Sequence, residues 1–159
     1  MVTQKILSIM SGLLICGDLL AISVPLGEAG GTYTVPVRLN DVITLDFVLD
    51  SGASEVQIPV DVVMTLLRAN TINKNDFLDG TVYKLADGSS VKGERFVLRK
   101  VQIGEHALNN VTAGISPMGA ELLLGQSVLA RLPNWSIDSD GPLRLDRDRR
   151  SYYVSSWMG

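Results

Sequence analysis

The sequence predicts an all-β fold made of many short strands, with one or two short helices. Three observations lead to this prediction. Apolar and polar residues alternate from Gly30 onward, turn dipeptides recur between the alternating segments, and only two segments show helical spacing. The chain has 159 residues, of which 46% are hydrophobic, so it is long enough to bury the core of one domain.

Composition excludes several classes of function. The formal net charge is -3, and without an excess of basic residues we expect no nucleic-acid partner. The chain has one histidine, His106, and one cysteine, Cys16. These counts argue against a metal site built from several such ligands and against an intramolecular disulfide. We therefore expect no metal and no cofactor, and an enzyme of this composition must rely mostly on carboxylates or hydroxyls.

The first 29 residues differ in composition from the rest of the chain. Their apolar runs resemble a secretory signal or a single membrane anchor, and Gly27-Glu28-Ala29 has the small-x-small form of a cleavage site. Asp18 lies inside the apolar stretch, where a carboxylate costs about 2.5–3.5 kcal/mol at the bilayer centre. We expect residues 1–29 to direct the protein to the cell envelope, as an anchor or an exported leader. The alternative is an ordinary buried helix.

The first strands of the body form a predicted hairpin. Residues 32–39 and 43–49 alternate in polarity and are separated by Asn40-Asp41, which is typical of a tight turn. The end of the second strand, Phe47-Val48-Leu49, is continuously apolar. This pattern is expected of a strand that is buried on both faces.

The rest of the body alternates between short strands and turns, apart from two helical segments. Residues 56–58 form a predicted strand, and Pro59 opens a helix over 60–69. Asp87-Gly88 joins residues 81–85 to 90–100 in a long hairpin. The other predicted turns and elements are, in order, Asp79-Gly80, Gly104-Glu105, Asn109-Asn110, strands at 111–115 and 122–124, a helical turn at 126–132, and a hairpin of 135–137 with 143–145.

The stretch that indicates chemistry follows the buried strand. Asp50 comes directly after Phe47-Val48-Leu49 and directly before Ser51-Gly52, so a carboxylate stands at the entrance of a glycine-containing loop. The triplet alone is a weak signal, because it arises by chance in roughly one chain in fifteen of this length. Its apolar approach and the segment Leu123-Leu124-Gly125 about seventy residues later make the signal strong.

On these motifs the chain resembles the retropepsin-like aspartic proteases, in particular their bacterial single-lobe branch. The resemblance runs from about Gly30 to Leu145 and includes Asp50-Ser51-Gly52-Ala53 and the flap-tip position Ala86-Asp87-Gly88. It implies a small closed β-barrel with a flap hairpin, in which Leu123-Leu124-Gly125 packs beneath the active loop. On this basis residues 30–146 form the protease domain, after the leader or anchor of 1–29 and before a C-terminal tail of 147–159.

The resemblance also implies a mechanism and a set of site residues. Two aspartates about 3 Å apart share one proton, and the pair activates a water molecule for attack on a peptide bond. The resemblance assigns catalysis to Asp50, Ser51 and Gly52, and contact with a polypeptide substrate to Ala53, Ala86, Asp87 and Gly88.

One chain supplies only one such loop, so the resemblance implies a homodimer in which Asp50 of each subunit faces its twin. The nearest second candidate, Asp138-Ser139-Asp140-Gly141, has an extra aspartate between serine and glycine and is typical of a hairpin turn. Gln126 stands where the retroviral members have arginine, so the dimer is expected to be weak. Ala53 offers no hydroxyl to the carboxylates, which predicts a less acidic pH optimum than that of pepsin.

Two alternatives from other classes remain open at this stage. Residues 83–90 could form a plain surface hairpin and not a flap, and the chain could keep the protease fold while serving as a binding or assembly module at the cell envelope. It could also be a membrane-associated interaction protein whose function lies in residues 1–29. The carboxylate of Asp50 favours an enzyme, because a scaffold gains nothing from an acidic group in an apolar loop, where burial is costly.

Overall fold

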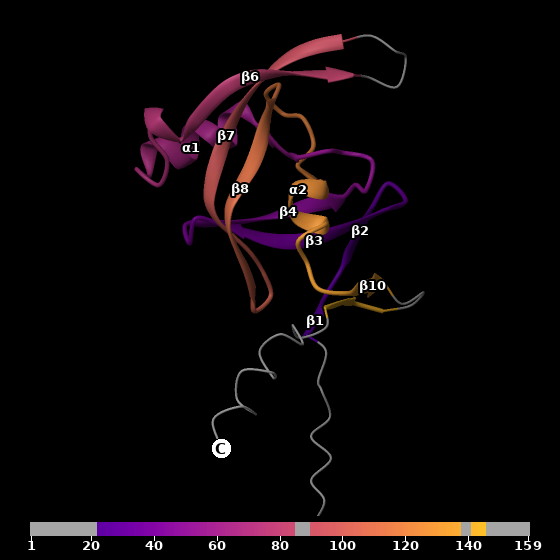
Figure 1. Ribbon diagram of the computed structural model, residues 1–159. Helices are drawn as coiled ribbons and strands as arrows, with labels where there is room; N and C mark the ends of the chain where they lie inside the picture. Colours follow the sequence, from indigo (N-terminus) through magenta and orange to yellow (C-terminus); the bar gives the residue numbers. More distant parts are fainter. Residues whose placement is uncertain (1–21, 85–89, 138–140, 146–159) are drawn as a thin grey trace, which may run out of the picture.

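A computed structural model describes residues 22–84, 90–137 and 141–145 of the chain (Figure 1). Strands make up most of these residues, which confirms the predicted all-β class. The elements are, in order, β1 (Ile22–Val24), β2 (Gly27–Ala29), β3 (Thr32–Leu39), β4 (Ile43–Leu49), β5 (Val56–Pro59), α1 (Val60–Arg68), the 3-10 turn η1 (Lys74–Asp76), β6 (Phe77–Lys84), β7 (Ser90–Ile103), β8 (His106–Ser116), β9 (Leu123–Leu124), α2 (Gln126–Leu129), β10 (Trp135–Ile137) and β11 (Leu143–Leu145).

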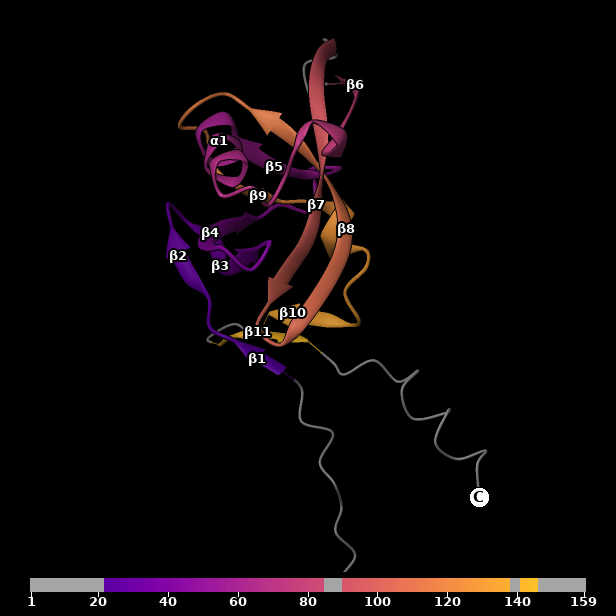
Figure 2. The same cartoon turned by 90° about the vertical axis from the view of Figure 1, so that its left-hand side faces the viewer.

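The main sheet closes on itself into a small barrel. Its strand order is β2-β3-β4-β9-β5-β8-β7-β6, and β3 also pairs with β7. That extra pairing completes a ring of six strands, and β2 and β6 extend from it. Figure 2, turned by 90° from Figure 1, shows α1 on the upper part of the barrel beside β5. The barrel that the resemblance implies is therefore present.

A second, three-stranded sheet lies at the lower end of the barrel in both views (Figures 1 and 2). It has the order β1-β11-β10, with both neighbours antiparallel to β11. Val24 of β1 is buried against the core together with Leu143 and Leu145 of β11. The predicted hairpin of 135–137 with 143–145 is confirmed. The first described strand begins at Ile22, upstream of residue 30, where the sequence predicts the start of the protease domain.

The turn between β3 and β4 shows how local chemistry sets the register. Asn40 and Asp41 both have positive φ angles, 46° and 61°, and Val42 donates its N–H to Leu39 at 2.9 Å. These are the features of a type I′ turn, which matches the twist of a hairpin. The Asn40 side chain also accepts the N–H of Lys100 at 3.0 Å, so the same residue fixes the turn against β7.

The core comes from the inward residues of the barrel strands and one face of α1. Pro59 precedes the helix in an extended conformation, and Val63 and Leu66 are buried while Leu67 is half-buried. The predicted helix over 60–69 is therefore confirmed to within one residue. The largest fully buried side chains are those of Phe47, Phe96, Leu39, Ile58, Leu66, Ile72, Leu98, Ile103, Leu124, Leu143, Leu145 and Val35.

Two predicted turns are wrong. Asp79-Gly80 lies inside β6, where the register against β7 shifts between Leu78 and Thr81. The dipeptide forms a bulge, because the extra residue is absorbed while the pairing continues on both sides. Asn109-Asn110 lies inside β8, and Asn110 takes a φ of 53° there without ending the strand. Asn is one of the few residues that adopt such an angle readily.

Of the other predicted turns, one is confirmed and two fall wholly or partly outside the described residues. Gly104-Glu105 forms the predicted turn, since Ile103 pairs with His106 across it. Asp87-Gly88 and Asp140 lie outside the described residues. In the described part of the chain, no helix combines the length and the apolar character needed to cross a bilayer.

Candidate active site

Asp50 lies at the end of β4, where the backbone is held by a neighbouring short strand. β9 runs parallel to β4, and the N–H of Asp50 donates to the carbonyl of Leu124 at 3.2 Å. β9 also pairs with β5, so it lies between the two strands that residues 50–55 connect. The connection must therefore arch over β9. We call residues 50–55 the Asp50 loop.

The carboxylate of Asp50 is oriented by the loop that follows it. Its Oδ1 atom accepts the N–H of Gly52 at 2.8 Å and that of Ala53 at 3.2 Å. The second oxygen, Oδ2, accepts no hydrogen bond from the described residues. Two amides on one oxygen fix the rotation of the group and leave the other oxygen available to a water molecule or a substrate.

Gly125 is required by the close approach of two backbones. A Cβ atom at this position would lie 2.3 Å from the carbonyl oxygen of Glu55 and 2.7 Å from that of Ala53. Its φ angle is −94°, which any residue adopts, so the requirement is one of space alone. The apolar-apolar-glycine segment therefore packs against the Asp50 loop, as the resemblance implies.

The residues after Gly125 bind the Asp50 loop through backbone and side-chain groups. The N–H groups of Gln126 and Ser127 donate to the carbonyls of Ala53 and Ser54 at 2.9 and 3.1 Å. The Gln126 side chain donates to the carbonyl of Ser51 at 2.8 Å. Gln126, which the sequence presents only as a departure from the retroviral pattern, thus holds the loop within one subunit.

Ser127 makes a contact with the start of β5 that local sequence patterns do not predict. Its hydroxyl accepts the N–H of Val56 at 3.0 Å, where the Asp50 loop passes into β5. The two residues are separated by 71 positions in the chain, and no local pattern announces the contact. The chemical clue is a serine in the first turn of a short helix, two residues after a close-packed glycine.

A second contact missed by the sequence links the loop to the β6–β7 hairpin. Nη1 of Arg95, on β7, lies 3.1 Å from Oε1 of Glu55, the last residue of the Asp50 loop. The side chains are 29% and 15% exposed, so solvent screens this ion pair only in part. The separation of 40 residues again hides the pair from local pattern analysis.

The predicted site residues divide into two groups. Asp50, Ser51, Gly52 and Ala53 lie together in the loop, with Ser51 and Gly52 exposed. Ala86, Asp87 and Gly88 lie outside the described residues. The hairpin that should carry them is present, because Lys84 pairs with Ser90 at the end of the described strands.

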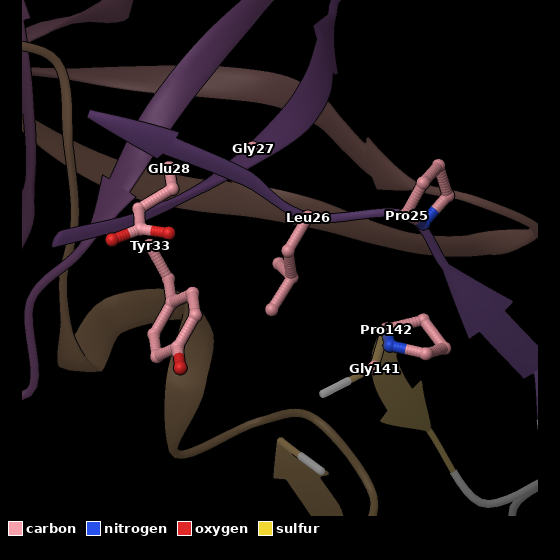
Figure 3. A pocket seen from close by; sticks show the side chains of 7 residues that line it. All are labelled: Pro25, Leu26, Gly27, Glu28, Tyr33, Gly141 and Pro142. Carbon is pink, nitrogen blue, oxygen red and sulfur yellow. The ribbon is translucent and has the colours of Figure 1, made fainter. Parts of the chain in front are cut away.

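A separate hollow of about 440 Å³ lies between the start of β2 and the residues that precede β11 (Figure 3). Its walls mix polar and apolar surface, and the side chains of Leu26 and Tyr33 lie there beside the carboxylate of Glu28 (Figure 3). None of the predicted site residues lines it. Across the described ranges, no three His, Cys, Asp or Glu side chains gather closely enough to hold a metal ion.

Comparison with known proteins agrees with this geometry. A family model described as aspartyl protease matches residues 35–128, more than half of the chain, and this range contains both the Asp50 loop and its Gly125–Ser127 support. The crystal structure of a retropepsin-like aspartic protease from Rickettsia conorii is similar to the chain with a TM-score of 0.58 and 20% identity. The similarity covers 78% of this chain and 89% of that one, and it shows a common fold. No curated protein matched the chain.

Proposed function

The chain belongs to the aspartyl protease family, and from this premise we propose that it is an aspartic endopeptidase whose active centre forms between two copies. The observation that carries the proposal is the Asp50 carboxylate, which is fixed through Oδ1 and accepts no hydrogen bond at Oδ2 from the described residues. A binding module would not require a carboxylate held in one orientation at the end of a barrel strand. General acid–base chemistry does require it.

The proposed mechanism needs a second carboxylate, which one chain does not supply in the same setting. In a homodimer the two Asp50 side chains face each other, and their repulsion makes them share one proton. The ionised partner removes a proton from a water molecule held between them, and the resulting hydroxide adds to the peptide carbonyl. The protonated partner donates to the carbonyl oxygen as it becomes tetrahedral. Collapse then breaks the C–N bond, and a proton passes to the leaving nitrogen.

The proposed substrate is an extended polypeptide. The β6–β7 hairpin projects beyond the barrel at the top of both views, and a strand-like hairpin adds backbone hydrogen bonds to an extended chain (Figures 1 and 2). We assign Ala86, Asp87 and Gly88 to this contact and Ser51 and Gly52 to the dimer axis, as the family resemblance implies. Ala53 contributes no hydroxyl beside the carboxylates, so the proposed pH optimum is less acidic than that of pepsin. A rate that rises steadily towards pH 3 would contradict this.

The decisive experiment compares casein cleavage by the wild type, Asp50→Asn and Asp46→Asn. Asp46 is an exposed carboxylate four residues upstream on β4, so Asp46→Asn controls for the loss of one negative charge and for the preparation of a variant protein. Asp50→Asn should lose at least about a hundredfold in rate, because the group that exchanges protons with water is gone. Asp46→Asn should cleave like the wild type. Equal cleavage by Asp50→Asn would leave the binding or assembly module as the better interpretation.

The shared active centre is tested by mixing. If each centre needs two Asp50 side chains, adding Asp50→Asn protein in excess should suppress wild-type activity through mixed dimers. The rate per subunit should also rise with concentration over the range where sedimentation detects dimers. A rate per subunit that is constant down to the strictly monomeric range would overturn the two-copy mechanism.

We also propose that the protein acts at the cell envelope. The support is the apolar composition of residues 1–21, which precede the first described strand. Cell fractionation of the full chain and of a chain beginning at residue 22 tests this. The full chain should be found in the envelope or exported fraction, and the shorter one in the cytoplasm.

A further inference from the structure

The β6–β7 hairpin leaves the barrel at a defined point. Along β7, Arg95 is the last residue that pairs with β8, and the residues from Gly93 to Ser90 pair only with β6. On β6 the bulge at Asp79-Gly80 follows Leu78, the partner of Arg95. We call the Leu78–Arg95 pair the elbow of the hairpin, because the direction of the two free strands is set there.

An ion pair links the elbow to the Asp50 loop. Glu55 ends the loop, and its backbone is pressed against Gly125, so its position is fixed by packing. Its carboxylate meets Arg95 at 3.1 Å. The Nε atom of Arg95 is buried and has no hydrogen-bond partner, so the guanidinium lacks a hydrogen bond that it would make in water. Glu55 therefore matters more to Arg95 than it would on an open surface.

We propose that Glu55 and Arg95 are positioning residues that set the angle of the β6–β7 hairpin over the Asp50 loop, and so govern polypeptide binding. This inference rests on the proposed protease function. Neither residue is needed to activate water, because the Asp50 carboxylate is held by Gly52 and Ala53. Breaking the pair should therefore raise KM for a peptide substrate far more than it lowers kcat.

The experiment measures kcat and KM for Glu55→Gln, Arg95→Met, the double variant and Arg95→Lys. Each of the first two should raise KM about tenfold, equivalent to about 1.4 kcal/mol, and change kcat less than twofold. The effects should not add in the double variant, because both changes remove the same interaction. Arg95→Lys keeps the charge and should restore most of the affinity.

The matched control lies four residues along the same strand. Arg99 pairs with Asp76 at 2.9 Å, away from the elbow, so Arg99→Met removes an arginine and an ion pair from β7 without touching the Asp50 loop. Its KM should equal that of the wild type. Unchanged KM for Glu55→Gln and Arg95→Met, or a loss confined to kcat, would overturn the inference while leaving the protease function intact.

A readout independent of activity keeps the inference testable if the protease proposal fails. Hydrogen exchange should speed up in the amides of Thr81–Lys84 and Ser90–Gly93 when Glu55 or Arg95 is replaced. Exchange in β4 and β9 should stay as in the wild type, because their hydrogen bonds do not involve the pair. Equal exchange of the hairpin in all variants would contradict a positioning role. Asp50→Asn should leave the hairpin exchange unchanged, which separates the two proposals.

Discussion

The Asp50 loop and the β6–β7 hairpin are built in opposite ways. The loop is held on several sides, by the β9 backbone, by the packing of Gly125 and by the Gln126 and Ser127 side chains. Among the described residues, the hairpin beyond the elbow pairs only between its own two strands, and the Glu55–Arg95 ion pair links its base to the Asp50 loop. A group that exchanges protons needs a fixed geometry, whereas a cover for varied polypeptides must adjust. The difference between the two regions is what the proposed function requires of them.

The largest expected effect comes from a substitution that disturbs the tightly held Asp50 loop, and Gly125 is the position to change. Gly125→Ala would place a Cβ atom 2.3 Å from a backbone oxygen, so the loop or the helix must move. We expect a loss of about 3 kcal/mol or more in unfolding free energy and loss of activity. Gly119→Ala is the control: its Cβ meets nothing within 4 Å, but its φ is +73°. It should cost only about 1–2 kcal/mol by backbone strain. Chemical denaturation measures both, and similar losses would refute the packing argument.

Truncation at the amino end should weaken the barrel beneath both regions equally. A chain beginning at residue 22 keeps every described strand, whereas one beginning at residue 30 lacks β1 and β2 and exposes Leu143 and Leu145. Loss of Val24 and of the β1–β11 pairing should cost about 3 kcal/mol. Thermal unfolding should show a markedly lower Tm for the shorter chain only. Equal Tm values would mean that β1 adds nothing to the fold.

A smaller change should loosen the loop alone. Ser127→Ala removes the acceptor of the Val56 N–H at the start of β5 and should cost about 1 kcal/mol. Ser136→Ala on the exposed edge strand β10 is the matched control and should stay within about 0.5 kcal/mol of the wild type. Denaturation midpoints measure the two variants. An effect of Ser136→Ala as large as that of Ser127→Ala would show that the hydroxyl bond is not the cause.

The smallest effect concerns pH and the base of β6. The hydrogen bond from Arg99 lowers the pKa of the Asp76 carboxyl from its ordinary value of 3.8, with help from the Asn73 N–H and against the effect of burial. A lowered folded-state pKa gives stability that is present above 3.8 and is lost as the pH falls through the folded value. Arg99→Met should therefore lose below about 1 kcal/mol near pH 7. The deficit should shrink at pH values below 3.8, as followed by denaturation across pH. A deficit that grows on acidification would have the wrong sign.

Local sequence patterns predict the strands and the Asp50 motif because both depend on neighbours in the chain. Alternation marks β3 and β4, but the burial predicted for both faces before Asp50 is confirmed only in part, because Phe47 is buried while Val48 and Leu49 are half-buried. Long-range pairing is less visible. Ile22–Val24 pairs with Leu143–Leu145, so an apolar segment that looks like part of a leader is a strand of the fold.

The same limit explains the errors at the turns and the contacts that were missed. Asp79-Gly80 has the composition of a turn, but pairing with β7 on both sides converts it into a bulge. The Glu55–Arg95 and Val56–Ser127 contacts join residues 40 and 71 positions apart, which no local period encodes. The second carboxylate of the proposed centre is inferred from the family resemblance and not from a local pattern, because the proposal places it in another copy of the chain.

The insertion of β9 between β4 and β5 also has a consequence for synthesis on the ribosome. Asp50 emerges early, but the groups that shape its surroundings belong to Leu124, Gln126 and Ser127. A nascent polypeptide shorter than about residue 122 thus contains the acidic group without its scaffold. Under the proposed function, such unfinished products cannot assemble a working centre, so hydrolysis has to wait until residues 123–127 have been synthesised.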